Sequence, residues 1–202
     1  MPNPRLYGFR YLGPMTGKNP QRPIRYRVAS AYAVALNIGD VVEEAAGGTC
    51  ILSPPGSAVL SMLGVIVGIG PYWDGVKMTM GDFLPANTTP GAVNFERESF
   101  VYVMPAANNL FEAVCGTLLA APTRAGYLTT IGNNIDHMNT PVANKNWPEL
   151  DAATAPAAAA AQWRIMDFSR TALAVDWAAL YVPLIVSGNE IATPPAAPLA
   201  GI

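Results

Sequence analysis

The segment that follows Arg25 alternates between large and small side chains with a period of two. The large side chains are Tyr26, Val28, Tyr32, Val34, Leu36 and Ile38, and the positions between them are Arg27, Ala29, Ala31, Ala33, Ala35 and Asn37. This period is typical of a β-strand, in which successive side chains point to opposite faces. An alanine-rich helix is the alternative, but the aromatic and β-branched content favours a strand. Gly39 and Asp40 break the pattern and indicate its end.

Short apolar segments continue along the rest of the chain. The further strands that we expect are Val41–Val42, Cys50–Leu52, Met62–Ile69, Val76–Met80, Phe100–Met104, Leu110–Cys115, Tyr127–Ile131, Ile165–Phe168 and Leu180–Val186. Gly, Pro and Asn pairs separate these segments and are typical of turns. Many short strands with such punctuation predict an all-β fold, a compact barrel or sandwich of short antiparallel strands. The 18 Gly and 19 Pro agree, because long helices do not tolerate them.

Three regions interrupt or flank this pattern. Residues 1–24 combine prolines and glycines with arginines and predict an extended basic N-terminal arm, with a disordered tail as the alternative. Residues 25–190 form the predicted β-barrel or sandwich domain, which carries a Pro-, Asn- and Ala-rich loop insertion at about 139–161. Residues 191–202 predict an extended C-terminal tail.

The composition predicts contacts beyond a single copy of the chain. Hydrophobic residues make up 51% of the 202 residues and charged residues 13%, about half the charged fraction usual in soluble domains. We therefore expect other copies, in a dimer or trimer, or a partner to cover part of the apolar surface. The longest apolar run, Val59–Ile69, is too short to span a bilayer, so we expect no transmembrane helix. The first residues lack the apolar stretch of a secretory signal, which predicts a chain that starts in a cytoplasm.

Residues that usually perform catalysis are few and scattered. The only histidine is His137, which follows Asp136, and we interpret this pair as a solvent-facing turn. Cys50 and Cys115 have no close Cys or His neighbours, which predicts two ordinary buried or half-buried thiols. The acidic pairs do not follow the oxygen-donor pattern of a calcium loop. We therefore expect no catalytic residues, no metal and no cofactor, and hence a protein that is not an enzyme.

Positive charge gathers near the N-terminus, although the whole chain has a net charge of −2 and a pI of about 5.3. Arginine and aromatic side chains are common anchors of protein interfaces. The candidate partner-binding residues are Arg5, Tyr7, Phe9, Arg10, Tyr11, Arg22, Arg25 and Arg27. The same mixture contacts phosphates and stacks on bases. Because the rest of the chain is slightly acidic, nucleic acid is the less favoured partner and an acidic protein surface the more favoured one.

Four segments carry motifs in a recognisable order. They are YRVASAYAVALNIGDVVEEAAGG from Tyr26, LGVIVGIGPYWDG from Leu63, VYVMPAANNLFEAVCG from Val101 and IGNNID from Ile131. With their Gly-Asp turn, their loop with Tyr and Trp and their Phe-Glu hairpin, they resemble the small β-rich head decoration or cement proteins of tailed bacteriophages, which are encoded beside the major capsid protein. The segment LYVPLIVSGNEI from Leu180 looks like a closing strand of that pattern.

The resemblance implies a β-barrel or tulip-like body on the outer surface of the virion. There, such a protein binds the lattice of the phage major capsid protein, bridges its subunits and stabilises the head as a non-enzymatic cement. It associates with itself and is assembled in the host cytoplasm. Two alternatives remain: another virion module, such as a tail or fibre part that binds a receptor or sugar, and a nucleic-acid-binding protein that uses the basic arm.

Overall fold

The computed structural model describes residues 8–15, 17, 21–28, 32–54, 62–73, 77–86, 99–115, 125, 128–142, 145–151, 161–168 and 182–188. Strands dominate this part of the chain, and the predicted all-β fold is confirmed. In chain order the strands are β1 (Arg10–Pro14), β2 (Ile24–Val28), β3 (Leu36–Asn37), β4 (Val41–Ala45), β5 (Thr49–Leu52), β6 (Met62–Ile69), β7 (Tyr72–Trp73), β8 (Met78–Thr79), β9 (Phe83–Leu84), β10 (Phe100–Pro105), β11 (Asn109–Cys115), β12 (Asn134–Val142), β13 (Lys145–Asp151), β14 (Trp163–Phe168) and β15 (Val182–Gly188). A short 3-10 turn, η1 (Ala46–Gly48), joins β4 to β5.

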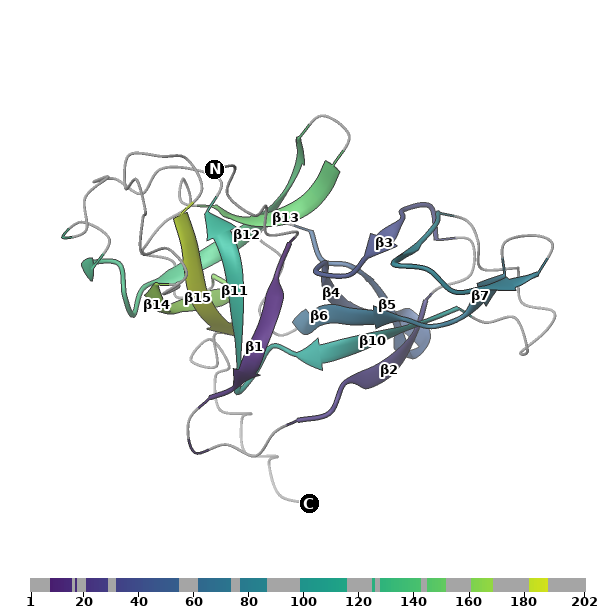
Figure 1. Cartoon of the computed structure of the whole chain (residues 1–202), viewed down its shortest axis with the longest axis horizontal. Helices are drawn as coiled ribbons and strands as arrows, with labels where there is room; N and C mark the ends of the chain where they lie inside the picture. Colours follow the sequence, from purple (N-terminus) through teal and green to yellow (C-terminus); the bar gives the residue numbers. More distant parts are fainter. Residues whose placement is uncertain are drawn as a thin grey trace, which may run out of the picture.

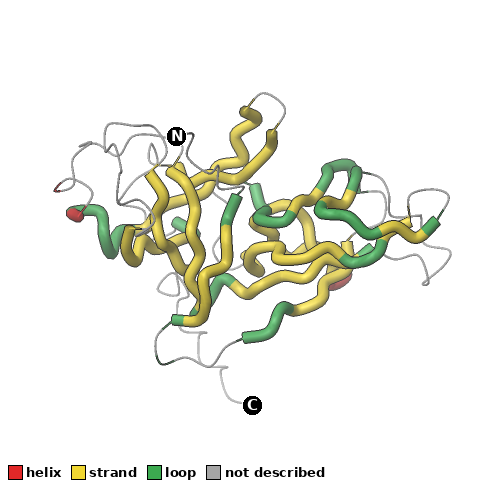
Figure 2. The backbone as a smooth tube through the Cα atoms, viewed as in Figure 1, coloured by secondary structure: helices red, strands yellow, loops and turns green. Residues whose placement is uncertain are grey.

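The strands form two closed units that lie side by side (Figure 1). In the first barrel, β10, β2, β5, β4 and β6 follow one another around a ring. The second sheet has the order β1-β11-β13-β12-β14-β15 and returns on itself, because β15 pairs with both β14 and β11. Two small ladders, β3–β9 and β7–β8, lie beside the first barrel (Figure 2). The expected barrel is therefore present as two units and not as one.

Neighbouring apolar residues of the first barrel belong to two different cores. The side chains inside the barrel include Val42, Ile66 and Val103. The residues immediately before or after them pack instead with the second sheet: Val41, Val65 and Met104. These three lie side by side across β4, β6 and β10 in the ladder register. A strand that is covered on both faces has no polar face, which explains the uninterrupted apolar run of β6.

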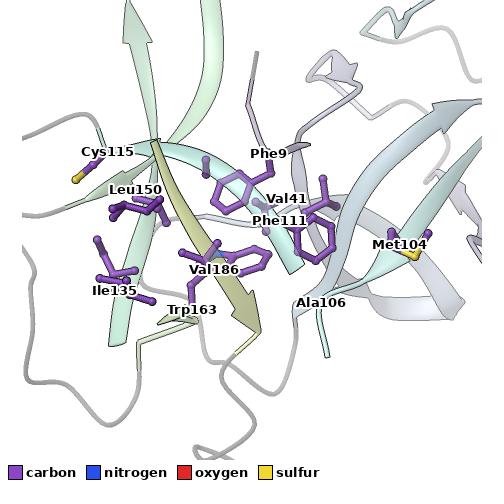
Figure 3. Packing of buried hydrophobic residues seen from close by; sticks show 14 residues of the cluster. Phe9, Val41, Met104, Ala106, Phe111, Cys115, Ile135, Leu150, Trp163 and Val186 are labelled. Atoms are coloured by element: carbon purple, nitrogen blue, oxygen red, sulfur yellow. The ribbon is translucent and has the colours of Figure 1, made fainter. Parts of the chain in front are cut away.

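We refer to the cluster that the first barrel shares with the second sheet as the joint. Its largest buried side chains come from the second sheet, and Figure 3 shows Phe111 on the side of the cluster near Val41 of the first barrel, with Leu150 and Ile135 on the other side. The largest side chains include Phe111, Ile135, Leu150, Trp163 and Ile165. Dense apolar packing of this kind stabilises a fold mainly through the area removed from water. The two units are therefore held together by a continuous hydrophobic core.

The chain crosses from the first barrel to the second sheet between β10 and β11. Asn108 has a positive φ of 61°, a conformation that Asn adopts more readily than most residues. The side-chain amide of Asn109 donates to the carbonyl oxygen of Pro105 at 2.9 Å and to the side-chain oxygen of Gln21 at 2.9 Å. Asn109 is buried, so these bonds satisfy the NH2 donor of an amide that would otherwise destabilise the crossing.

Residues 8–15 do not extend from the body as the predicted arm would. The strand β1 pairs with β11, and the N–H of Phe9 donates to the carbonyl oxygen of Gly39 at 3.0 Å. Prolines and glycines exclude a helix or a central strand here, but they permit a strand at the edge of a sheet, which is where β1 lies. The interpretation of residues 1–24 as a separate arm is therefore wrong for 8–15. The predicted tail at 191–202 lies outside the described residues.

Three other sequence predictions differ from the structure. The alternating segment after Arg25 forms two strands, β2 and β3, in place of one. Residues 129–132 form a turn where a strand was expected. Much of the predicted loop at 139–161 belongs to the β12–β13 hairpin, which pairs from Asp136 with Asp151 to Val142 with Lys145. Towards its tip, from Asn139 onward, this hairpin has no third strand beside it in the described ladders. The prolines there can therefore face away from the partner strand without removing a hydrogen bond between strands.

Candidate functional site

The six candidate partner-binding residues that the structure describes do not form one surface. Phe9 is buried, whereas Arg10 and Tyr11 lie on β1 beside β11. Two others, Arg5 and Tyr7, lie outside the described residues. The remaining three are exposed on or just before β2: Arg22, Arg25 and Arg27.

Phe9 is a core residue, and its interpretation as a partner contact is wrong. Only 2% of its surface is exposed. Its ring stacks on Trp163 with the centroids 4.6 Å apart and meets the ring of His137 edge-on at 6.4 Å. An aromatic side chain with such neighbours stabilises the fold through buried area and ring geometry. Phe9 therefore fastens the N-terminal segment into the joint.

Arg10 neutralises a carboxylate that the fold buries. Glu112 on β11 is fully buried, and it stands opposite Arg10 in the ladder and forms an ion pair with it. The Arg10 side chain itself remains 54% exposed. Because removing one partner of a buried pair leaves an uncompensated charge, Arg10 has a structural role in addition to any role at the surface.

Replacing Arg10 with alanine should lower the free energy of unfolding by about 1–2 kcal/mol, between the values typical of exposed and buried pairs. Urea denaturation at neutral pH measures this change. In the Arg10→Ala background, Glu112→Gln should recover part of the loss, because it removes the unpaired charge. An Arg10→Ala protein as stable as the wild type would contradict a structural role for this pair.

A second arrangement lies on the outside of the first barrel, on β2 and its neighbour β10. Val28, Val101 and Val103 point into the barrel, so the alternate residues point outward. The outward residues are Arg25, Arg27, Phe100 and Tyr102, which we name the basic–aromatic face. Arg25 is paired with Tyr102 and Arg27 with Phe100 in the antiparallel register.

A buried polar cluster lies where the first barrel meets the second sheet. It consists of Ser53 after β5, His137 on β12 and Gln162 just before β14, all fully buried. The ring Nε2 of His137 lies 3.0 Å from the Ser53 carbonyl oxygen, and the Gln162 amide donates to the Ser53 hydroxyl at 3.3 Å. The backbone N–H of Gln162 donates to the Asp136 carboxylate at 3.1 Å. The predicted solvent-facing turn at Asp136 and His137 is therefore wrong, because both lie on a strand and His137 is buried.

This cluster has the residue types of a hydrolytic site but not its geometry. A general base must contact the proton that it removes. Here His137 contacts the backbone carbonyl of Ser53, whereas the Ser53 hydroxyl lies 3.4 Å from the Glu43 carboxylate. The arrangement ties β5 to β12 and β14 across the joint, so it stabilises the contact between the two units.

Burial shifts the pKa values of two ionisable groups near the joint: it lowers that of His137 and raises that of Asp40. Burial lowers the pKa of His137, although the Ser53 carbonyl, Gln162 and the carboxylates of Asp136 and Glu43 oppose this shift. Burial raises the pKa of Asp40 from 3.8 to about 7, although Asn37 donates to its carboxylate through the backbone N–H at 2.7 Å. In both cases the low-dielectric surroundings favour the neutral form.

Sequence reasoning missed the joint cluster and Asp40. A usable signal was the pairing of adjacent apolar residues on β4, β6 and β10, because it indicates strands that are covered on both faces. The burial predicted for Cys50 and Cys115 is confirmed, and they lie in different cores.

Within the described residues, no three His, Cys, Asp or Glu side chains come together in a way that could hold a metal ion. The same part of the chain contains no helix of the length and apolar character needed to cross a membrane. Comparison of the chain with protein-family models, with curated proteins and with solved structures finds no match.

Proposed function

We propose that the chain is a capsid decoration protein of a tailed bacteriophage, a non-enzymatic cement that binds the outer surface of the major capsid protein lattice and stabilises the head. One observation carries the proposal. The only histidine, together with Ser53 and Gln162, is buried where the first barrel meets the second sheet, and its contact with Ser53 connects the two units. These side chains, which could otherwise serve as catalytic groups, thus stabilise the contact between the two units, as expected of a protein with a mechanical role.

The arrangement of the body supports the same role. The first barrel is closed and the second sheet returns on itself through β15, so most strands of the two units are paired on both sides. The basic–aromatic face presents arginine and aromatic side chains on the outside of this body. Many copies around a shell add their individual contacts through avidity, so each copy needs only modest affinity. Self-association into a dimer or trimer would add further contacts of this kind.

The experiment that tests this function uses phage heads prepared without the chain. Purified protein should cosediment with these heads, saturate at a fixed number of copies and appear on the outer shell by electron microscopy. It should also raise, by several degrees, the temperature at which the heads release DNA. Labelling confined to the tail, or no binding to heads, would contradict the proposal and favour another virion module.

A further inference from the structure

The outer surface of β2 and β10 is distinguished by the kind of side chains that it displays. We infer that the basic–aromatic face docks an acidic segment of a partner protein. The inference rests on the proposed function, in which that partner is the major capsid protein. It identifies which surface of the body makes the contact and what chemistry the opposing surface must have.

The ring of Phe100 holds the guanidinium of Arg25 in place. The guanidinium carbon of Arg25 lies 4.5 Å from the centroid of the Phe100 ring, within the range of a cation–π contact. Tyr102, which is 39% exposed, stands opposite Arg25 in the ladder. A guanidinium that rests on a ring loses less conformational entropy on binding, and its edge stays available for a carboxylate. Arg25 is therefore prepared to form a bidentate contact.

Charge is distributed unevenly around the first barrel. The strands β2, β10 and β6 contain two arginines and no acidic residue, and Arg22 is exposed just before β2. The acidic residues of the barrel strands are Glu43 and Glu44, both on β4, which β5 separates from β2. Among the described residues the basic–aromatic face carries positive charge only, and such a surface is complementary to a negatively charged partner.

The same charges favour a protein over a nucleic acid. A duplex-binding protein typically contacts about 6–10 phosphates. The basic–aromatic face contributes two arginines, or three with Arg22, on a chain of net charge −2. Arginine with tyrosine or phenylalanine is the combination enriched at the centres of protein interfaces. An acidic polypeptide segment is thus the occupant that fits this face.

The test compares Arg25→Glu with Lys77→Glu. Both substitutions change the net charge by two, and Lys77 is exposed between β7 and β8, whose ladder contains neither β2 nor β10. Binding is measured to two probes: a fluorescent poly-L-glutamate peptide, by anisotropy, and phage heads that lack the chain, by cosedimentation. We expect Arg25→Glu to weaken binding to both probes at least tenfold and Lys77→Glu to leave it within twofold. Tyr102→Ala should weaken both several-fold, and unchanged far-UV circular dichroism confirms that each variant is folded.

The outcomes separate this inference from the proposed function. If Arg25→Glu binds heads and peptide as the wild type does, the docking surface is wrong although head binding stands. If the wild type binds the peptide through Arg25 but does not bind heads, the surface stands and the decoration function fails. Tight binding of a single-stranded DNA oligonucleotide, lost in Arg25→Glu and steeply dependent on salt, would overturn the acidic-protein partner in favour of nucleic acid.

Discussion

Replacing Phe9 with alanine should lower the free energy of unfolding by about 3–5 kcal/mol, the range typical of a large aromatic side chain removed from a core. The substitution removes the ring that stacks on Trp163 and meets His137, and it leaves a cavity in the joint. A loss of this size is a large fraction of the total stability of most domains. Urea denaturation followed by far-UV circular dichroism measures the change.

Leu12→Ala is the matched control for this prediction. Leu12 lies on β1 in the same segment and is also apolar, but 42% of it is exposed. Its truncation should cost less than about 1 kcal/mol, because little area is removed from the core. If Phe9→Ala were no more destabilising than Leu12→Ala, the N-terminal segment would be a separate arm after all, and Phe9 would not belong to the joint.

The position of Phe9 also changes how truncations should be interpreted. Deleting residues 1–23 removes Phe9, β1 and the partner of the buried Glu112 together. Such a protein would lose head binding simply because its body is destabilised. Single substitutions on the exposed basic–aromatic face avoid this ambiguity, since they leave the joint intact.

The positions of strands were predictable where an apolar run and the turn residues beside it are enough to define the strand. The limits of β6 were predicted at both ends, because Ser61 interrupts the apolar run before it and Gly70-Pro71 follows it. The strands β10 and β11 were predicted to within one residue for the same reason. In contrast, the β12–β13 hairpin was missed, because its Pro and Asn residues are typical of loops when only the local sequence is considered.

The joint was not predictable from local patterns, because it depends on residues far apart in the chain. Phe9 and Trp163 become neighbours only when β1 pairs with β11 and β14 packs behind it. Likewise, His137 follows an aspartate and looks locally like part of a turn. In the fold it is buried beside Ser53 and Gln162, and Ser53 is far from it in the sequence. Of the candidate site residues that the structure describes, those with the exposed positions that their composition suggested are Arg10, Arg22, Arg25 and Arg27, and Arg10 is also the ion-pair partner of Glu112.

The structure also provides an internal explanation for the apolar composition. The first barrel is covered on its outer side by the second sheet, so Val41, Val65 and Met104 are buried without any partner chain. Part of the hydrophobic excess therefore stabilises the contact between the two units. Exposed apolar side chains remain elsewhere, for example Met80 and Phe83, but the composition alone is weaker support for oligomerisation than the sequence suggested.

Asp40→Asn should strongly change the pH dependence of stability. Asp40 is buried in the loop before β4, and burial raises its pKa from 3.8 to about 7. A carboxyl group with a raised pKa contributes stability that is fully present below pH 3.8 and is lost as the pH rises through about 7. At about 1.4 kcal/mol per pH unit, the loss between these limits is roughly 4 kcal/mol.

Asparagine keeps the oxygen that accepts the N–H of Asn37 but cannot ionise. The free energy of unfolding of Asp40→Asn minus that of the wild type should therefore rise by several kcal/mol between pH 4 and pH 8, with the variant the more stable protein at pH 8. The lowered pKa of His137 acts with the opposite sign, since its stabilisation is present above pH 6.5 and is lost as the pH falls, but it is common to both proteins and cancels in the difference. A difference that stays constant from pH 4 to pH 8 would mean that Asp40 is ionised throughout and that this loop admits water. The pH profile thus measures how well water is excluded from the loop around Asp40, where the Gly39 carbonyl oxygen accepts the N–H of Phe9.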